Sequence, residues 1–233
     1  MGIEEATELH KQIKRKFKRC RAMVFNIDDI WSADLDTSKE KLSEENKGYK
    51  YLLNVINVFS KYAYSIPFKS KSSDFIIEAF NKLFKFDNRK PNKLWTDRGS
   101  EFVNHKFKNF LKSHKNKLYH TFNEGKVVVV QRFNRTLGEM IQKHMTANKT
   151  TKDINVLQKL IDEYNNKNHS SIKLSPHAAS KSENMWLIIQ NLYGNVKQDI
   201  RKRKFKIGDR VRIYKYRTLF KKVISQTGLK KCL

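Results

Sequence analysis

Two aspartates and a glutamine occupy three short motifs whose residue types fit one metal-dependent site. Asp34 lies in the apolar run Trp-Ser-Ala-Asp-Leu (31–35), which predicts a strand, and Asp97 ends a second short strand in Leu-Trp-Thr-Asp-Arg-Gly-Ser-Glu-Phe (94–102). Gln131 opens the helical stretch Gln-Arg-Phe-Asn-Arg-Thr-Leu (131–137). Enzymes of phosphoryl transfer commonly hold two divalent cations about 3.5–4 Å apart between carboxylates. We therefore expect Asp34 and Asp97 to hold Mg²⁺ or Mn²⁺, with Gln131 at the position of a third ligand.

Gln131 limits what such a site can do. A carboxamide offers one neutral oxygen, and its NH₂ group cannot bind a cation. We therefore expect weak metal binding and impaired catalysis. Two other acids could substitute for the missing carboxylate: Glu124, in a loop, and Glu139, which lies about 12 Å further along the predicted helix.

The net charge indicates a polyanionic partner. Lys and Arg outnumber Asp and Glu by 49 to 23, which gives a net charge of +26. A charge of this size causes self-repulsion and is usually retained for binding nucleic acid. The chain has no run of about 18 apolar residues, so no transmembrane helix and no membrane partner are expected.

Basic and polar residues near the three motifs, and in a later basic tract, are the candidate nucleic-acid contacts. Residues 197–217 contain ten basic residues and two aspartates. Phosphate contacts are the function we favour for these groups, and a solvated surface or linker is the alternative. The candidates are Tyr119, Asn123, Arg132, Asn134, Arg135, Lys143, Lys202, Arg203, Lys204, Arg210 and Arg212.

Hydrophobic periodicity predicts an α/β fold with a mixed sheet. Apolar and β-branched runs predict strands over 30–35, 49–59, 62–68, 93–96 and 118–122. Helical spacing predicts helices over 74–84, 105–113, 127–145, 154–164 and 185–192, with Ser73 and Asn104 as N-caps. Residues 170–180 are expected to form a loop around Pro176. The order of these elements is typical of helices layered on a sheet.

Together the motifs resemble the integrase core of retroviruses, long-terminal-repeat retrotransposons and self-synthesising (Polinton or Maverick type) DNA transposons. The resemblance covers about residues 27–180 and includes Gly-Tyr-Lys-Tyr-Leu-Leu-Asn-Val-Ile-Asn-Val-Phe-Ser-Lys-Tyr-Ala (48–63) besides the three motifs above. It implies a ribonuclease H-like mixed sheet flanked by helices, with a catalytic site of two aspartates and a glutamate. Asp34 and Asp97 match the aspartates, and Gln131 replaces the glutamate. Gly138 stands where such helices have a lysine that reaches DNA.

The resemblance also implies an activity and a domain order. The family hydrolyses DNA at the 3′ ends of an element, joins these ends to target DNA, and assembles as oligomers. We expect a basic N-terminal arm over 1–27, the catalytic-core-like domain over 28–182, and a helix with a basic linker over 183–204. Residues 205–233 resemble an incomplete SH3-like β segment, because they end too early to close the barrel.

Three functions are compatible with these features. The first is a transposon-derived protein that binds DNA largely non-specifically, has impaired DNA integration activity and resides in the nucleus. The second is an active recombinase in which Glu124 or Glu139 completes the site. The third is a non-catalytic module that binds chromatin or a full-length integrase.

Overall fold

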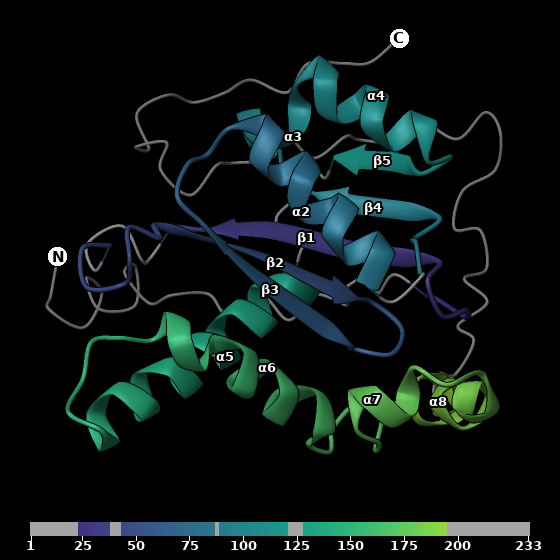
Figure 1. The fold of residues 1–233 in the computed structure, drawn as a ribbon. Helices are drawn as coiled ribbons and strands as arrows, with labels where there is room; N and C mark the ends of the chain where they lie inside the picture. The colour runs from purple at the N-terminus through teal and green to yellow at the C-terminus, as the bar shows by residue number, and fades with distance from the viewer. Residues whose placement is uncertain (1–22, 38–42, 87–88, 121–127, 195–233) are drawn as a thin grey trace, which may run out of the picture. The chain divides into compact units, whose positions relative to one another are not determined.

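A computed structural model describes residues 23–37, 43–86, 89–120 and 128–194 of the chain (Figure 1). All of these described residues belong to one compact unit. Within the described part, two 3₁₀ turns, η2 (Ile154–Val156) and η3 (Ser182–Asn184), accompany the regular elements. These elements are β1 (Ile30–Asp36), β2 (Tyr51–Asn57), β3 (Ala63–Phe68), α2 (Ser73–Phe86), β4 (Lys93–Thr96), α3 (Ser100–Val103), α4 (His105–Ser113), β5 (Lys117–His120), α5 (Val128–Ala147), α6 (Leu157–Asn166), α7 (Pro176–Ala179) and α8 (Met185–Tyr193).

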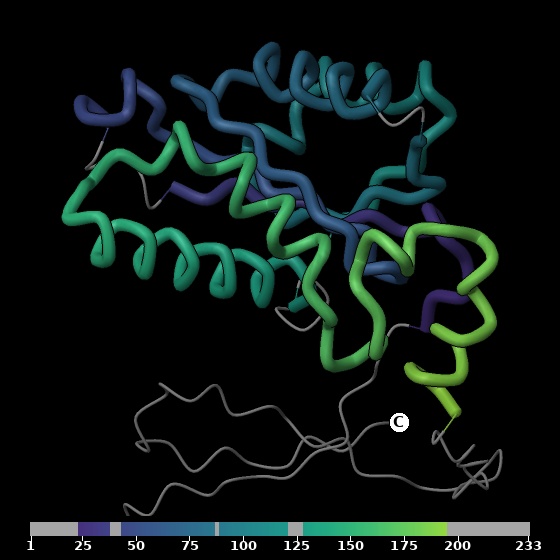
Figure 2. Tube along the Cα trace, turned by 60° about the horizontal axis from the view of Figure 1, so that its bottom comes forward, coloured from purple at the N-terminus to yellow at the C-terminus, as the bar shows by residue number. Residues whose placement is uncertain are grey.

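The five strands form one mixed sheet in the order β3-β2-β1-β4-β5. The first three strands are antiparallel neighbours, whereas β4 and β5 continue the sheet parallel to β1. Helices cover both faces: α2 and α4 lie on one, and α5 and α6 on the other (Figures 1 and 2). The predicted α/β fold, a mixed sheet flanked by helices, is therefore confirmed.

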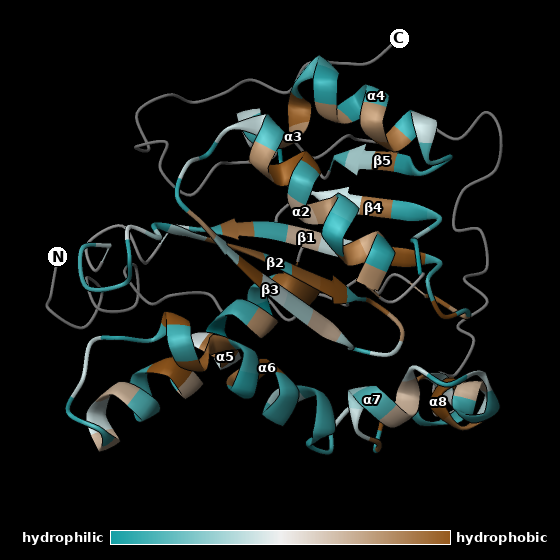
Figure 3. Cartoon of the chain, viewed as in Figure 1, coloured by the Kyte–Doolittle hydropathy of each residue, from teal (hydrophilic) through white to brown (hydrophobic). Residues whose placement is uncertain are grey.

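Alternation along the strands decides which side chains meet which helices. Trp31 and Ala33 of β1 are fully buried in the core under α2 and α4. Leu52 and Ile56 of β2 point to the opposite face and pack against α5 and α6. In Figure 3 hydrophobic residues concentrate on the central strands of the sheet, whereas β5 and long stretches of the helices are hydrophilic. Asp34, one position beyond Ala33, therefore faces α5.

A side-chain amide joins α6 to the edge of the sheet. Asn165 accepts a hydrogen bond from the Ala63 N–H at 2.9 Å and donates one to the Ala63 carbonyl at 2.9 Å. Ala63 begins β3, which is an edge strand of the sheet in the described part of the chain. The Asn165 side chain thus forms the two hydrogen bonds that a further strand would form with Ala63. It pairs a backbone N–H and a backbone C=O that would be costly to bury without partners.

Most predicted elements are confirmed, with local corrections. Asn104 caps α4 as predicted, because its Oδ1 accepts from the Phe107 N–H at 2.8 Å. The predicted cap of α2 is wrong by one residue: the helix begins at Ser73, and the Ser72 hydroxyl accepts from the Phe75 N–H at 3.5 Å. Residues 170–180 contain the short helix α7, whose Pro at the first turn fits a helix start.

Helix α8 packs onto the same compact unit as the sheet. Ile188 is fully buried in a cluster with Val24 and Phe59. The Tyr193 hydroxyl accepts a hydrogen bond from the Val24 N–H at 2.9 Å. In the part of the chain that the structure describes, no helix is both long enough and apolar enough to cross a membrane. The predicted SH3-like segment and most of the predicted N-terminal arm lie outside the described residues.

Candidate active site

The sheet brings the two predicted aspartates side by side on the neighbouring strands β1 and β4. β1 and β4 are parallel, and Ser32 is the register partner of Trp95. Continuing this register by two residues places Asp34 beside Asp97. Trp95 and Asp97 share the face of β4 opposite to Leu94, which is buried under α2 and α4. Both carboxylates therefore lie on the α5 side of the sheet.

Asp34 is half-buried and lies within electrostatic reach of Asp97. Burial raises the pKa of the Asp34 carboxyl, and the charge of Asp97 raises it further. The Leu35 N–H and the Asn134 amide lower it, because they donate hydrogen bonds to the charged form. Asp97 itself is exposed, and its Oδ1 accepts from the Gly99 N–H at 2.9 Å. The site is thus open on one side and buried on the other.

A row of polar side chains leads across the sheet to Asp34. Ser65, Asn54 and Asp34 are successive register partners on β3, β2 and β1. The Ser65 hydroxyl donates to Asn54 Oδ1 at 2.6 Å, and Asn54 Nδ2 donates to Asn134 Oδ1 at 3.0 Å. Asn134 Nδ2 then donates to Asp34 Oδ2 at 2.7 Å. Each donor strengthens the next, since hydrogen bonds in a chain polarise one another.

This row occupies one oxygen of Asp34 and orients the carboxylate. Asn54 is fully buried, so its amide would be costly there without partners. Asn134 satisfies the Asn54 amide and reaches Asp34 from α5. The Asn134 side chain therefore links α5 to the sheet. It also fixes the direction in which the second carboxylate oxygen of Asp34 points.

Gln131 lies on the same side of α5 as Asn134. The two residues are three positions apart, which places them on adjacent turns of one helix face. Gln131 is exposed, and Gly138 on the same face leaves open space where a side chain would be. The helix thus presents two amides and a glycine toward the open side of the carboxylate pair.

The donor set fits a weakly held divalent cation. Asp34 and Asp97 supply anionic oxygens from two strands, which suits Mg²⁺ or Mn²⁺. Among the described residues, no group of three or more His, Cys, Asp or Glu could hold a metal ion. The two carboxylates can therefore contribute to a cation site, and the residues of α5 beside them, Gln131 and Asn134, add only neutral amide oxygens.

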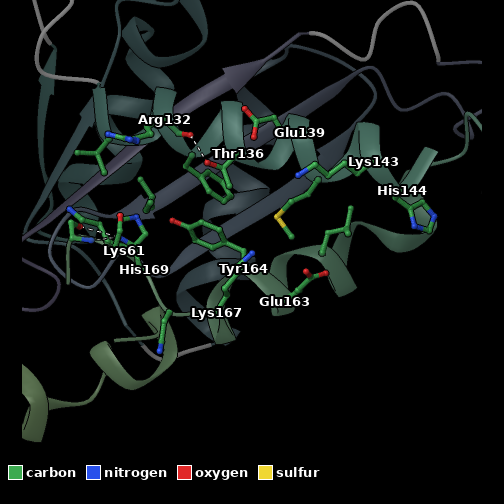
Figure 4. A pocket seen from close by; sticks show the side chains of 18 of the residues that line it. Lys61, Arg132, Thr136, Glu139, Lys143, His144, Glu163, Tyr164, Lys167 and His169 are labelled. Atoms are coloured by element: carbon green, nitrogen blue, oxygen red, sulfur yellow. Dashed lines mark hydrogen bonds between the residues drawn. The ribbon is translucent and has the colours of Figure 1, made fainter. Parts of the chain in front are cut away.

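The predicted nucleic-acid contacts fall on different faces. Asn134 contacts Asp34, whereas Arg132 and Lys143 line a groove between α5 and α6 with Glu139 (Figure 4). Tyr119 is the register partner of Trp95 on β5 and is 45% exposed, so it lies near the strand end that precedes Asp97. Arg135 is exposed on α5. The structure therefore separates Arg132 and Lys143 from the carboxylates.

Several predicted positions lie outside the described residues. These positions are Asn123, Glu124, Lys202, Arg203, Lys204, Arg210 and Arg212. Glu139, the other candidate substitute acid, is described. It lines the α5–α6 groove, whereas Asn134 on the same helix faces Asp34.

Asn54 and Ser65 belong to the site although they were not predicted from the sequence. A signal existed for Asn54, because it interrupts the apolar run Tyr-Leu-Leu-Asn-Val-Ile (51–56) of a buried strand. A buried amide needs hydrogen-bond partners. The sequence does not identify those partners, since Ser65 and Asn134 become neighbours only through strand pairing and helix packing.

Known proteins share sequence similarity with this chain. Residues 26–122 match the integrase core domain family. Over this segment the chain is similar to integrases. A transposon-derived protein of Caenorhabditis elegans is 28% identical over 186 residues, which are 80% of this chain and 62% of that protein. The present chain thus spans less than two thirds of its relative.

Solved integrase structures share the fold. The catalytic core domain of HTLV-2 integrase, solved in complex with magnesium in a trimeric form, superposes with a TM-score of 0.55 at 20% identity. That match covers 66% of this chain and 97% of the viral domain. A chain of the simian T-cell lymphotropic virus intasome, in complex with a PP2A regulatory subunit, has a TM-score of 0.64 at 16% identity, with 73% and 61% coverage.

Proposed function

We propose that this chain is a transposon-derived, DNA-binding integrase-like protein in which Gln131 impairs DNA cutting and joining. The observation that carries the proposal is the pairing of two aspartates with amides. Asp34 lies within β1 and Asp97 directly follows the neighbouring strand β4, while Asn134 and Gln131 are polar residues of α5 on that side. The transposon-derived relative and the integrase core match support the origin of the fold.

The proposed cation ligands are Asp34 and Asp97. A bound Mg²⁺ or Mn²⁺ would stabilise negative charge on the oxygens of a reacting phosphate. The protein itself contributes orientation, because the amide of Asn134 fixes Asp34 and the Gly99 N–H fixes Asp97. A third carboxylate would add one negative charge to this set, whereas Gln131 adds none. Weak cation binding is the expected consequence.

DNA is the proposed partner, and the nucleus is the compartment that this partner implies. The net charge of +26 favours phosphate contacts over the whole chain. Exposed Tyr119 and Arg135 lie on elements that flank the carboxylates, so they are the described candidates for contact with a DNA end. The basic tract over 197–217 would add backbone contacts. The oligomeric forms of the viral cores make self-association a further part of the proposal.

The test is metal-dependent nicking of labelled duplex DNA by the natural chain and by Gln131→Glu. We expect nicking only by the Glu variant in the presence of Mg²⁺ or Mn²⁺, and its loss when Asp97→Asn is added. The matched control is Gln142→Glu. It makes the same charge change on the same helix, eleven residues and about 16 Å further along, too far to join the site.

Nicking by the natural chain would overturn the proposal that Gln131 impairs DNA cutting, and would favour an active recombinase. Glu139→Gln would then ask whether Glu139 substitutes for the third ligand. Its position in the α5–α6 groove opposes that role. No metal-dependent nicking by Gln131→Glu would show that the carboxylate pair is not an intact catalytic site, and would leave a DNA-binding role to be tested by binding alone.

A further inference from the structure

The groove between α5 and α6 contains a second cluster of chemically active side chains. The groove has a volume of about 870 Å³, and one end is lined by Lys61, Arg132 and His169 (Figure 4). These residues come from the β2–β3 turn, from α5, and from the segment after α6. Arg132 precedes Asn134 by two positions, so the two side chains point to nearly opposite sides of the helix. The cluster is therefore separate from the carboxylates.

Lys61 is held in an unfavourable backbone conformation at this end of the groove. Its φ is 63°, a left-handed value that residues with a Cβ seldom adopt. Its Nζ donates to the Val58 carbonyl at 2.5 Å, and burial lowers the pKa of the ammonium to about 8. A glycine or asparagine would suit this turn better.

His169 presents a hydrogen-bond donor to the same space. Its Nδ1 accepts from the Ser171 N–H at 3.3 Å and contacts the Ser171 hydroxyl at 3.0 Å. Burial, with Lys61 and Arg132 nearby, lowers the pKa of His169 to about 4. The neutral ring therefore prevails at neutral pH, and because Nδ1 accepts from a backbone N–H, its proton resides on Nε2.

Two cations lie here without a neutralising acid. Neither Lys61 nor Arg132 forms a salt bridge within the described ranges, although Glu139 and Glu163 also line the groove. Half-buried Lys61 and exposed Arg132 carry like charges, and both charges disfavour a positive charge on the His169 ring. A bound anion would relieve both effects and would accept hydrogen bonds from all three groups.

We propose that Lys61, Arg132 and His169 form a phosphate-binding site on the face of α5 turned away from Asp34. The ligand chemistry is a phosphate group with several anionic oxygens. It could belong to a nucleic-acid backbone or to a free phosphate. Since the cluster uses none of the residues of the carboxylate site, the proposal does not depend on the proposed function.

The first experiment is thermal unfolding and calorimetric titration of the full chain with inorganic phosphate, at constant ionic strength maintained with chloride. We expect phosphate to raise the Tm of the natural chain. The variants are Arg132→Gln and Lys61→Gly, and glycine suits the positive φ of position 61. Each should weaken phosphate binding about tenfold, because each removes a charge-assisted hydrogen bond. Lys159→Gln, which removes one exposed lysine of α6 outside the groove, should keep the natural affinity.

The second experiment distinguishes the two sources of phosphate. The same variants are titrated with a short DNA duplex. If Arg132→Gln and Lys61→Gly weaken DNA binding more than Lys159→Gln does, the site takes a backbone phosphate. If they lose inorganic phosphate but bind DNA as Lys159→Gln does, the site takes free phosphate.

Equal responses of all four proteins to inorganic phosphate, or no response beyond that to chloride, would overturn the proposal. Asp34→Asn tests whether phosphate binding depends on the carboxylate site. It should leave phosphate binding unchanged, so a failure of the phosphate site and a failure of the proposed function can be told apart.

Discussion

Asp34 is kept as a carboxylate in surroundings that disfavour its charge. Burial and the neighbouring Asp97 raise its pKa, while Asn134 and the Leu35 N–H act in the opposite direction. Groups at functional sites are often held in this way, because the arrangement that binds a cation is strained without it. In the free protein, the repulsion between the two aspartates therefore lowers stability.

Replacing Asp34 with Asn should stabilise the free protein by about 1 kcal/mol, since it removes that repulsion while Oδ1 can still accept from Asn134. Urea unfolding at pH 7 measures the change. A carboxyl whose folded pKa is raised loses stability as pH rises from its unfolded value of 3.8 through the folded pKa. The difference between the two proteins should therefore vanish below pH 3.8.

Added Mg²⁺ provides the second arm of this experiment. It should raise the free energy of unfolding of the natural chain and leave Asp34→Asn unchanged, because ligands that bind the native state stabilise it by mass action. A less stable Asp34→Asn protein at pH 7 would contradict the electrostatic account of the site.

Helix α5 combines two surfaces in one element. One side carries Gln131, Asn134 and Gly138 toward the carboxylates, while Arg132 and Lys143 line the groove against α6. Between them, Phe133 and Leu137 are buried in the core. The apolar stripe fixes the rotation of the helix, and this rotation determines which polar residues reach Asp34.

Gly138→Ala should stabilise the protein by about 1 kcal/mol, because glycine is the weaker helix former and a Cβ at this position meets nothing within 4 Å. Chemical denaturation measures the effect. Gly194→Ala is the contrasting variant, since its Cβ would lie 2.6 Å from the Gln190 carbonyl oxygen at the end of α8. A Gly138→Ala protein that is no more stable than the natural chain would contradict this prediction.

Local patterns in the sequence predicted the elements better than they predicted the site. The β4 strand and the Asn104 cap depend on neighbouring residues, so they were correct. The bond between Asn134 and Asp34 joins residues one hundred positions apart. Lys61 and His169 are likewise distant in sequence. Such pairs depend on strand register and helix rotation, which no short motif encodes.

At the scale of the whole molecule, charge dominates the behaviour expected of the chain. The excess of Lys and Arg over Asp and Glu gives +26, far more than the described site could use. Within the described residues, exposed salt bridges such as Lys82 with Glu78 and Lys106 with Asp74 neutralise little of this charge. The described surface therefore stays strongly basic, and its exposed lysines and arginines can contact phosphates.

Affinity for duplex DNA should fall steeply and linearly on a plot of log affinity against log salt. Each phosphate that the protein neutralises releases a counterion and contributes about −0.9 to the slope, so roughly six contacts would reduce affinity about a thousandfold between 50 and 200 mM salt. Fluorescence anisotropy with a labelled duplex measures the slope. Arg132→Gln should reduce it by about one if the groove takes a backbone phosphate. Gln142→Asn changes no charge on α5, so it should leave the slope unchanged. An affinity independent of salt would mean that the charge of this chain serves another partner, and the proposed DNA-binding function would fail.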